Sequence, residues 1–192
     1  GIPKSVPVPE SAAIEPVSAY GASKQSIENF LRLGSLRHGN PVTSLRVSNP
    51  FGPWQIGNKG QGAIAAFLSA AIERRPIHIW GDGSVVRDYI YIDDVVSAYL
   101  LTLREADKFE AFTEFDVGSG TLIDIRTFVQ NLYEVIKSQR PDLTTVLGFG
   151  DVPLRSGELM QVKVNNSALV KLGWNPSNTL HRGINNIVKV KQ

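Results

Sequence analysis

A tyrosine and a lysine four residues apart, Tyr20 and Lys24, are residues whose types and spacing could do chemistry. On a helix they lie one turn apart on the same face. A phenol in water titrates at a pH of about 10, and an ammonium group beside it favours the phenolate form. Such a pair could accept and return a proton near neutral pH. The spacing alone is weak evidence, because Tyr133 and Lys137 repeat it with no other chemistry-bearing residues around them.

The helix that carries this pair is predicted over residues 19–37. Ser18 is a candidate N-cap, and the Gly-Asn-Pro sequence at 39–41 stops the helix. The pair falls on one stripe with Ile27 and Leu31, so both polar residues share the apolar face. A surface helix normally turns lysine outward, so a lysine on this face needs a partner. The second pair is interpreted as a core-edge aromatic and a solvated lysine.

Short strands and helices alternate along the rest of the chain, which favours an α/β fold. A loop containing four prolines is predicted at the start. In chain order we then predict strand 42–47, helix 63–74, strand 77–80, an extended segment 85–92, a helix capped by Asp93 or Asp94, strand 114–117, a helix capped by Asp124, a strand over 144–147, an irregular segment 148–161, and helices 167–172 and 180–190.

Composition excludes several classes of function. The 192 residues fit one domain, or one domain plus part of another. The net charge is only +2 and basic residues form no run, so nucleic-acid binding is not expected. The absence of cysteine and three dispersed histidines argue against a metal site, and a reducing, cytoplasmic location is expected. No apolar run approaches the roughly 20 residues of a membrane span. The first residues, which include no initiator methionine, suggest a fragment rather than a signal peptide.

Several loop residues could bind an anionic ligand together. Arg87 and Arg155, with Asn49, could clamp a diphosphate, because guanidinium binds phosphate oxygens bidentately. Glu158 could accept hydrogen bonds from a ribose diol, and Trp80 offers an aromatic surface for a base.

Each of these residues also has a purely structural interpretation. Asn49 precedes a proline and could be a turn residue, and Arg87 could form an ion pair with Asp88. Arg155 and Glu158 would by default be solvated surface charges. His78 more often packs or hydrogen-bonds locally than acts as a base.

With these residues in hand, the chain resembles the extended short-chain dehydrogenase/reductase family, in particular NAD-dependent UDP-glucose 4-epimerase-like nucleotide-sugar epimerases. The likeness covers nearly the whole chain, and its motifs occur in order. They are the proline-rich segment 1–10, Tyr-x-x-x-Lys at 20–24, the strand and Asn-Pro-Phe-Gly-Pro loop at 45–53, Trp-Gly-Asp-Gly with Arg-Asp-Tyr-Ile-Tyr-Ile-Asp-Asp at 80–94, and Arg-x-Gly-Glu at 155–158.

The resemblance implies a role for each matched residue. Tyr20 would be the acid/base at the sugar C4 hydroxyl during transient oxidation by NAD, and Lys24 would bind the nicotinamide ribose and favour the phenolate. Pro50 would neighbour the nicotinamide. The remaining matches are substrate-binding residues: Asn49, Arg87 and Arg155 at the diphosphate, His78 and Trp80 at the uracil, Glu158 at the uridine ribose, and Gly62 where some epimerases place a substrate-contacting asparagine. A homodimer through the Tyr-Lys helix is also implied.

The departures from the family pattern are at the beginning. Nothing in this sequence matches the family's Gly-x-x-Gly-x-x-Gly turn, which binds NAD at a helix N-terminus. The catalytic Ser/Thr would lie before Gly1. The chain therefore resembles a C-terminal portion that is expected to be inactive alone. Residues 1–53 would end a Rossmann-like doubly wound parallel sheet, and 54–192 would form mainly a smaller α/β substrate domain, with 88–118 returning to the sheet.

Three functions stay open on the sequence. The first is a UDP-glucose/UDP-galactose or N-acetylhexosamine 4-epimerase. The second is a nucleotide-sugar 4,6-dehydratase or decarboxylase on the same scaffold. The third is a non-catalytic nucleotide-sugar-binding module.

Overall fold

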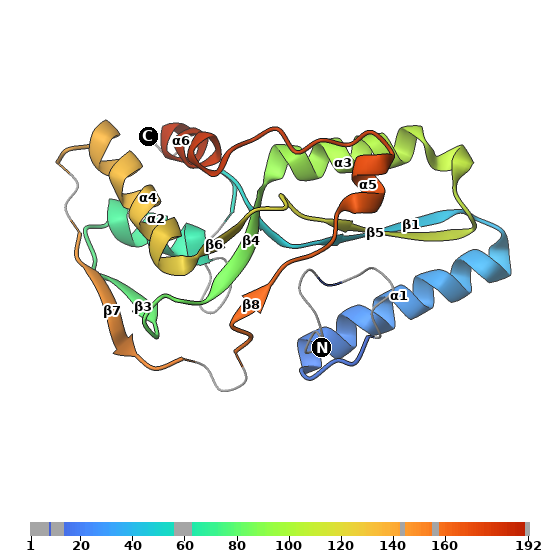
Figure 1. Cartoon of the computed structure of the whole chain (residues 1–192), viewed down its shortest axis with the longest axis horizontal. Coiled ribbons are helices and arrows are strands. Elements are labelled where there is room, and N and C mark those ends of the chain that lie inside the picture. The colour runs from blue at the N-terminus through green and yellow to red at the C-terminus, as the bar shows by residue number, and fades with distance from the viewer. Residues whose placement is uncertain (1–7, 9–13, 56–62, 143–144, 155–157, 191–192) are drawn as a thin grey trace.

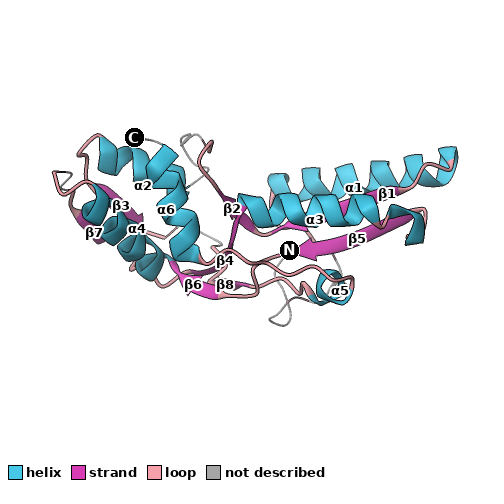
Figure 2. Ribbon diagram, turned by 90° about the horizontal axis from the view of Figure 1, so that it is seen from above, coloured by secondary structure: helices cyan, strands magenta, loops and turns pink. Residues whose placement is uncertain are grey.

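The computed structural model describes residues 8, 14–55, 63–142, 145–154 and 158–190. Its helices and strands form two groups, which lie at opposite ends of the long axis in Figure 1. Three short strands and the strand that they share lie between the groups, and the same division is visible from above in Figure 2.

The first group is a layered unit around two parallel strands. β1 (Val42–Val47) pairs in parallel with β5 (Phe112–Val117). α1 (Ala19–His38) and α3 (Ile92–Arg104) lie on opposite sides of these strands in Figure 1. The 3₁₀ turn η1 (Ala106–Lys108) follows α3, and α5 (Ser167–Lys171) packs beside β5. An apolar core that includes Ile90, Val117 and Trp174 joins α3 and α5 to the strands.

The second group packs three helices against another parallel pair. β3 (Ile77–Trp80) pairs with β7 (Leu147–Val152). The helices are α2 (Ala63–Ile72), α4 (Ile125–Gln139) and α6 (Leu180–Val190). Its core is the larger of the two and includes Leu68, Phe128, Leu132 and Ile184.

One strand, β4 (Val86–Tyr91), connects the two groups. It pairs in parallel with β2 (Asn49–Phe51) and with β8 (Gln161–Val162), and antiparallel with β6 (Leu122–Asp124). Its last residue, Tyr91, belongs to the second core, and its neighbour Ile90 belongs to the first. β4 therefore places residues of both groups next to one another.

The predicted α/β class is confirmed, and so are the local signals that start and stop helices. The Ser18 side chain accepts a hydrogen bond from Gly21 N, and Asp124 accepts one from Thr127 N. Gly39 ends α1 in the left-handed conformation with φ of 70°. The division at residue 53 into a Rossmann-like part and a substrate domain stays a prediction.

Two local predictions were wrong. Neither Asp93 nor Asp94 caps α3; the N-cap is Tyr91, without a side-chain hydrogen bond. The buried Asp94 carboxylate instead accepts three hydrogen bonds, from Ser177 N, Asn178 N and Asn178 Nδ2, and so holds the loop before α6. Most of β7 lies in the segment predicted to be irregular, because its two glycines hide the strand pattern.

The face of α1 that meets the sheet is polar, and the stripe that the sequence pattern marks as apolar does not meet the sheet. Ser35 is the only residue of α1 that is buried. Its hydroxyl lies within hydrogen-bonding distance of the carbonyls of Asn40 and Ala111, to which its single proton can be donated, whereas Ile27 and Leu31 are exposed. Polar side chains, not apolar packing, therefore hold α1 on β1 and β5.

Glycine 183 marks a close contact inside the second core. A Cβ at Gly183 would lie 2.8 Å from both the Phe51 and Tyr91 rings. We expect Gly183→Ala to lower the free energy of unfolding by about 1–3 kcal/mol, measured by urea denaturation. The control is Gly34→Ala on α1, where no atom lies within 4 Å of the added Cβ. That change should stabilise the helix by about 0.5–1 kcal/mol, and equal effects of the two changes would contradict the packing argument.

Candidate active site

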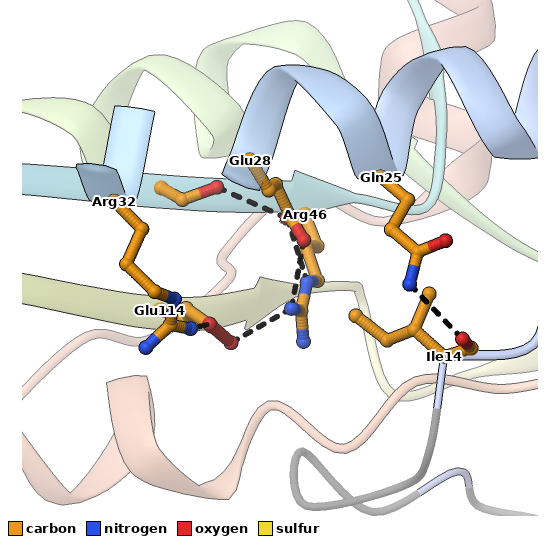
Figure 3. Close-up of polar contacts among 7 residues, drawn as sticks. Ile14, Gln25, Glu28, Arg32, Arg46 and Glu114 are labelled. Atoms are coloured by element: carbon orange, nitrogen blue, oxygen red, sulfur yellow. Dashed lines mark hydrogen bonds and ion pairs between the residues drawn. The ribbon is translucent and has the colours of Figure 1, made fainter. Parts of the chain in front are cut away.

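Three polar contacts fix how α1 lies along the sheet. Glu28 contacts Arg46 on β1, and Arg32 contacts Glu114 on β5 (Figure 3). The third contact joins Ser35 to the Ala111 carbonyl before β5. Residue numbers rise along α1 while they fall along the strands, so α1 runs antiparallel to β1 and β5. The first turn of α1 consequently points toward the carboxyl end of β1.

The antiparallel direction of α1 determines which residues at the end of β1 lie level with Tyr20. Tyr20 lies eight residues before Glu28, which is about 12 Å along a helix. At about 3.3 Å per strand residue, that distance reaches three to four residues beyond Arg46. For a helix parallel to the strands, this projects Tyr20 to the level of Asn49 and Pro50, at the strand edge where open α/β sheets bind ligands.

The Tyr20 and Lys24 side chains are accessible. Tyr20 is 65% exposed, and the Lys24 Nζ lies 5.4 Å from the centroid of its ring. The hydroxyl and the ammonium group therefore share one surface of α1, as the four-residue spacing predicts. Their catalytic roles stay predictions.

Glu28 and Arg46 form a bidentate ion pair. Arg46 Nε and Nη2 lie 2.8 Å and 2.9 Å from the two Glu28 carboxylate oxygens, and Nη2 lies 2.7 Å from Glu114 Oε2. Ser44 Oγ donates to the same carboxylate at 3.2 Å. The hydrogen bond from Arg46 holds the pKa of Glu28 below its ordinary value of 4.5, so this carboxylate is charged at neutral pH. Its stabilising contribution is lost only as the pH falls below that value.

The predicted diphosphate residues are partly brought together around β4. Asn49 Nδ2 donates to the Asp88 carbonyl at 3.1 Å, which ties β2 to β4. Arg87 donates to the Leu159 carbonyl at 2.7 Å and forms an ion pair with Glu158. The alternative of an Arg87–Asp88 ion pair is wrong, because the partner of Arg87 is Glu158. Arg155 and Gly62 lie outside the described residues.

Asp88 is a buried carboxylate beside these residues. It accepts hydrogen bonds from Ser119 N at 2.8 Å, Ser119 Oγ at 2.7 Å and Gly120 N at 3.2 Å. Burial raises the pKa of Asp88, although these donors and Lys163 act in the opposite direction. The backbone passes so close that a Cβ at Gly118 would lie 2.6 Å from Asp88 Oδ2. Asp88 therefore fastens the loop that follows β5 to β4.

His78 and Trp80 lie on the exposed face of β3, while Ile77 and Ile79 are buried on the other face. The turn that follows Trp80 is held from α4. Arg126 donates twice to the Asp82 carbonyl, and its guanidinium carbon lies 4.0 Å from the centroid of the Phe149 ring. His78 and Trp80, the two residues predicted to contact the base, thus lie on the same face of β3, next to a turn that Arg126 holds in place.

A hollow of about 550 Å³ lies elsewhere, at the amino end of β5. Four of its neighbouring charged side chains are paired, Arg32 with Glu114 and Lys108 with Glu105. It is lined by Arg32, Lys108, Phe109, Glu110, Phe112, Thr113 and Glu114.

The part of the chain that the structure describes holds no cluster of three or more residues suited to a metal ion. Among those same residues, no helix combines the length and apolar character that crossing a membrane requires.

Sequence reasoning missed Glu28, Arg46 and the capture of the 118–120 loop by Asp88. A signal existed for the first two. Glu28 continues the four-residue step of Tyr20 and Lys24, and Arg46 is a charged residue inside an otherwise uncharged strand. A charge in a half-buried strand requires a partner nearby.

Comparison with known proteins supplies a family for this geometry. A model described as the NAD dependent epimerase/dehydratase family matches residues 2–118. This match includes the Tyr-x-x-x-Lys segment, β1, β4 and β5.

Curated relatives and solved structures agree with that match. A dTDP-L-rhamnose 4-epimerase of Burkholderia thailandensis is 35% identical over 170 residues, covering 88% of this chain and 45% of the relative. A putative UDP-glucose 4-epimerase of Methanocaldococcus jannaschii is 30% identical, covering 98% and 58%. The crystal structure of UDP-glucose 4-epimerase from Thermotoga maritima, with UDP-glucose, superposes with a TM-score of 0.83 at 30% identity, covering 98% of this chain and 58% of that one. The chain spans about half the length of the curated relatives it matches.

Proposed function

Because this chain belongs to the NAD dependent epimerase/dehydratase family, we propose that the intact protein, meaning the complete native polypeptide containing these residues, is a nucleotide-sugar 4-epimerase. Its proposed substrates are UDP-glucose and UDP-galactose, or the corresponding N-acetylhexosamines. The observation that supports this proposal is the antiparallel direction of α1 along β1 and β5, from which ideal helix and strand dimensions project Tyr20 toward Asn49 and Pro50, just beyond the carboxyl end of β1.

In the proposed reaction Tyr20 takes the proton of the sugar C4 hydroxyl and returns it to the same oxygen when C4 is reduced from its opposite face. The phenol oxygen accepts the proton as the hydroxyl is oxidised and donates it back as the carbonyl is reduced. The Lys24 Nζ lies 5.4 Å from the centroid of the Tyr20 ring, close enough for both side chains to contact one ligand. Exposure of both side chains leaves them accessible to a ligand.

The residues present fit one end of NAD. Tyr20 and Lys24 offer a hydroxyl and an ammonium group on one accessible surface, where they would hold the nicotinamide ribose, with Pro50 beside the nicotinamide. The sequence contains no glycine-rich dinucleotide turn, so these residues provide no match for the pyrophosphate of the cofactor. When bound, NAD supplies the two-electron acceptor for oxidation at C4.

The nucleotide end of the substrate is assigned to the face around β3 and β4. His78 and Trp80 would contact the base, and Asn49, Arg87 and Arg155 the diphosphate. Glu158 would meet the ribose. Since Arg87 and Glu158 form an ion pair, binding in this manner requires them to share or exchange partners with the ligand. Gly62 stays a proposed substrate contact.

The test is turnover by the purified intact protein with NAD. We expect UDP-glucose and UDP-galactose to interconvert, monitored by the anomeric proton signals. Because one relative is named for a dTDP-sugar, dTDP-glucose is the matched alternative substrate. Conversion of dTDP-glucose but not of the UDP-sugars would show that the substrate nucleotide is dTDP rather than UDP. Loss of water with formation of a 4-keto-6-deoxy sugar would favour the dehydratase alternative, and binding without any turnover would favour a non-catalytic module.

A homodimer through α1 is proposed as well. Its outward surface carries Ile27, Phe30, Leu31, Leu33 and Leu36, all exposed. Apolar surface of this extent on one helix is typical of an interface. Light scattering by the intact protein should give twice the chain mass, and a monomer at micromolar concentration would contradict the assignment.

A further inference from the structure

We propose that Glu28 and Arg46 are positioning residues for the reaction, because their bidentate ion pair sets the register of α1 on the sheet and thereby places Tyr20 and Lys24. This inference rests on the proposed function. The four residues Arg32, Glu28, Arg46 and Glu114 are called the clamp below, and Figure 3 shows how they bridge α1, β1 and β5.

The first step of the argument is that apolar packing does not fix α1. Buried cores hold helices in one position because their side chains interdigitate. The single buried residue of α1 is Ser35, a serine, and its apolar residues are exposed. Sliding α1 along the strands would therefore meet little opposition from interdigitated side chains. Directional polar contacts must define its position.

The second step is that the hydrogen bonds of the clamp require a defined orientation of Glu28 relative to Arg46. Arg46 makes two hydrogen bonds to Glu28, at 2.8 Å and 2.9 Å, and the planar guanidinium requires both carboxylate oxygens to lie in its fork. Arg46 itself is held by Glu114 at 2.7 Å, and β5 is held by β1 through their parallel ladder. The Glu28 and Arg46 side chains are only 18% and 24% exposed, so water competes weakly for these bonds.

The third step concerns how the position of Glu28 on α1 determines the position of Tyr20. Ser35 and Arg32 fix the carboxyl half of α1, and Gln25 fastens the preceding segment through the Ile14 carbonyl at 3.1 Å. Among the hydrogen bonds of the described residues, that of Glu28 joins α1 to the sheet at the point nearest Tyr20. A slip by one helical turn would move the phenol by about 5.4 Å. Misplacement of a catalytic group by only 1 Å can lower a rate by about 10²-fold.

The decisive variant is Glu28→Gln in the intact protein. It removes the charge but keeps an acceptor, and Arg46 retains Glu114, so the protein is expected to fold. We expect kcat to fall about tenfold or more while KM for the nucleotide sugar changes less than about threefold, because the substrate contacts are untouched. Arg46→Lys, which cannot form the fork, should show the same split.

The matched control is Glu73→Gln. Glu73 also pairs with an arginine, Arg75, at 2.7 Å, but both side chains are more than half exposed and lie away from α1. Its kinetic constants should equal those of the wild type. Equal losses in the Glu28 and Glu73 variants would overturn the proposal.

A second readout does not depend on turnover. Amide hydrogen exchange in the first three turns of α1 should quicken about tenfold in Glu28→Gln, whereas exchange at Leu132 and Ile136 of α4 should not change. Unchanged exchange in α1, or kcat within twofold of wild type, would overturn the positioning role. If the wild type turns over no nucleotide sugar, the proposed function fails, and the exchange measurement alone then decides whether the clamp sets the position of α1.

Discussion

Replacing Tyr20 with phenylalanine is expected to lower kcat for 4-epimerisation by about 10³-fold, because the variant keeps the ring and loses only the oxygen that carries the proton. The side chain is 65% exposed, so the deleted hydroxyl leaves no buried cavity and the fold should be unaffected. The measurement is steady-state turnover, with nucleotide-sugar binding followed separately by calorimetry. Binding should stay within about threefold of the wild type.

The chain supplies its own control for this change. Tyr133 and Lys137 have the same spacing on α4, in the group of elements that does not contain α1. Tyr133→Phe should leave kcat unchanged. Retained turnover in Tyr20→Phe, or an equal loss in Tyr133→Phe, would remove the assigned role from Tyr20.

Replacing Asp88 with alanine is expected to lower the free energy of unfolding by about 3 kcal/mol or more. The change leaves three donors without their acceptor: Ser119 N, Ser119 Oγ and Gly120 N. It also opens a space against Gly118, whose backbone packs on this carboxylate. Urea denaturation of the intact protein measures the loss. The control is Asp93→Ala, an exposed residue in the first turn of α3, which should cost less than about 1 kcal/mol.

The effect of Asp88→Ala should depend on pH in a known direction. Burial raises the pKa of this carboxyl above its ordinary value of 3.8, so the folded protein binds the proton more tightly than the unfolded chain. The stabilising contribution of the proton is complete below that value and is lost as the pH rises through the raised one. The difference in unfolding free energy between wild type and variant should therefore narrow between pH 4 and pH 7. A difference that widens over this range would contradict the assignment.

Local chemistry explains which parts of the fold were predictable. Ser18, Gly39 and Asp124 act within one turn of their own position, so a short stretch of sequence carries the whole signal. The strands Val42–Val47 and Ile77–Trp80 are rich in β-branched residues and were found at their predicted bounds. The likeness to the Thermotoga maritima enzyme confirms the predicted Rossmann-like α/β class.

Only the site residues that belong to a known sequence motif could be predicted. Tyr20 and Lys24 were found by spacing and family likeness, but the side of α1 that meets the sheet was not. Periodicity identifies an apolar stripe and cannot tell whether that stripe faces the chain's own sheet or another surface. Glu28 meets Arg46 across 18 residues of sequence, and Arg87 meets Glu158 across 71. Such partners are set by the tertiary fold, and no local pattern records them.

The position of β4 has a consequence for how the chain acquires its structure. Its partners are β2, 40 residues earlier, β6, 34 to 38 residues later, and β8, 75 residues later. At a synthesis rate of about 5–20 residues per second, β4 leaves the ribosome several seconds before β8 exists. During that interval the backbone groups of β4 that pair with β8 are open to any extended segment nearby. We expect the yield of correctly paired protein to rise when translation through residues 92–160 is made faster, and to fall when synonymous slow codons are placed there.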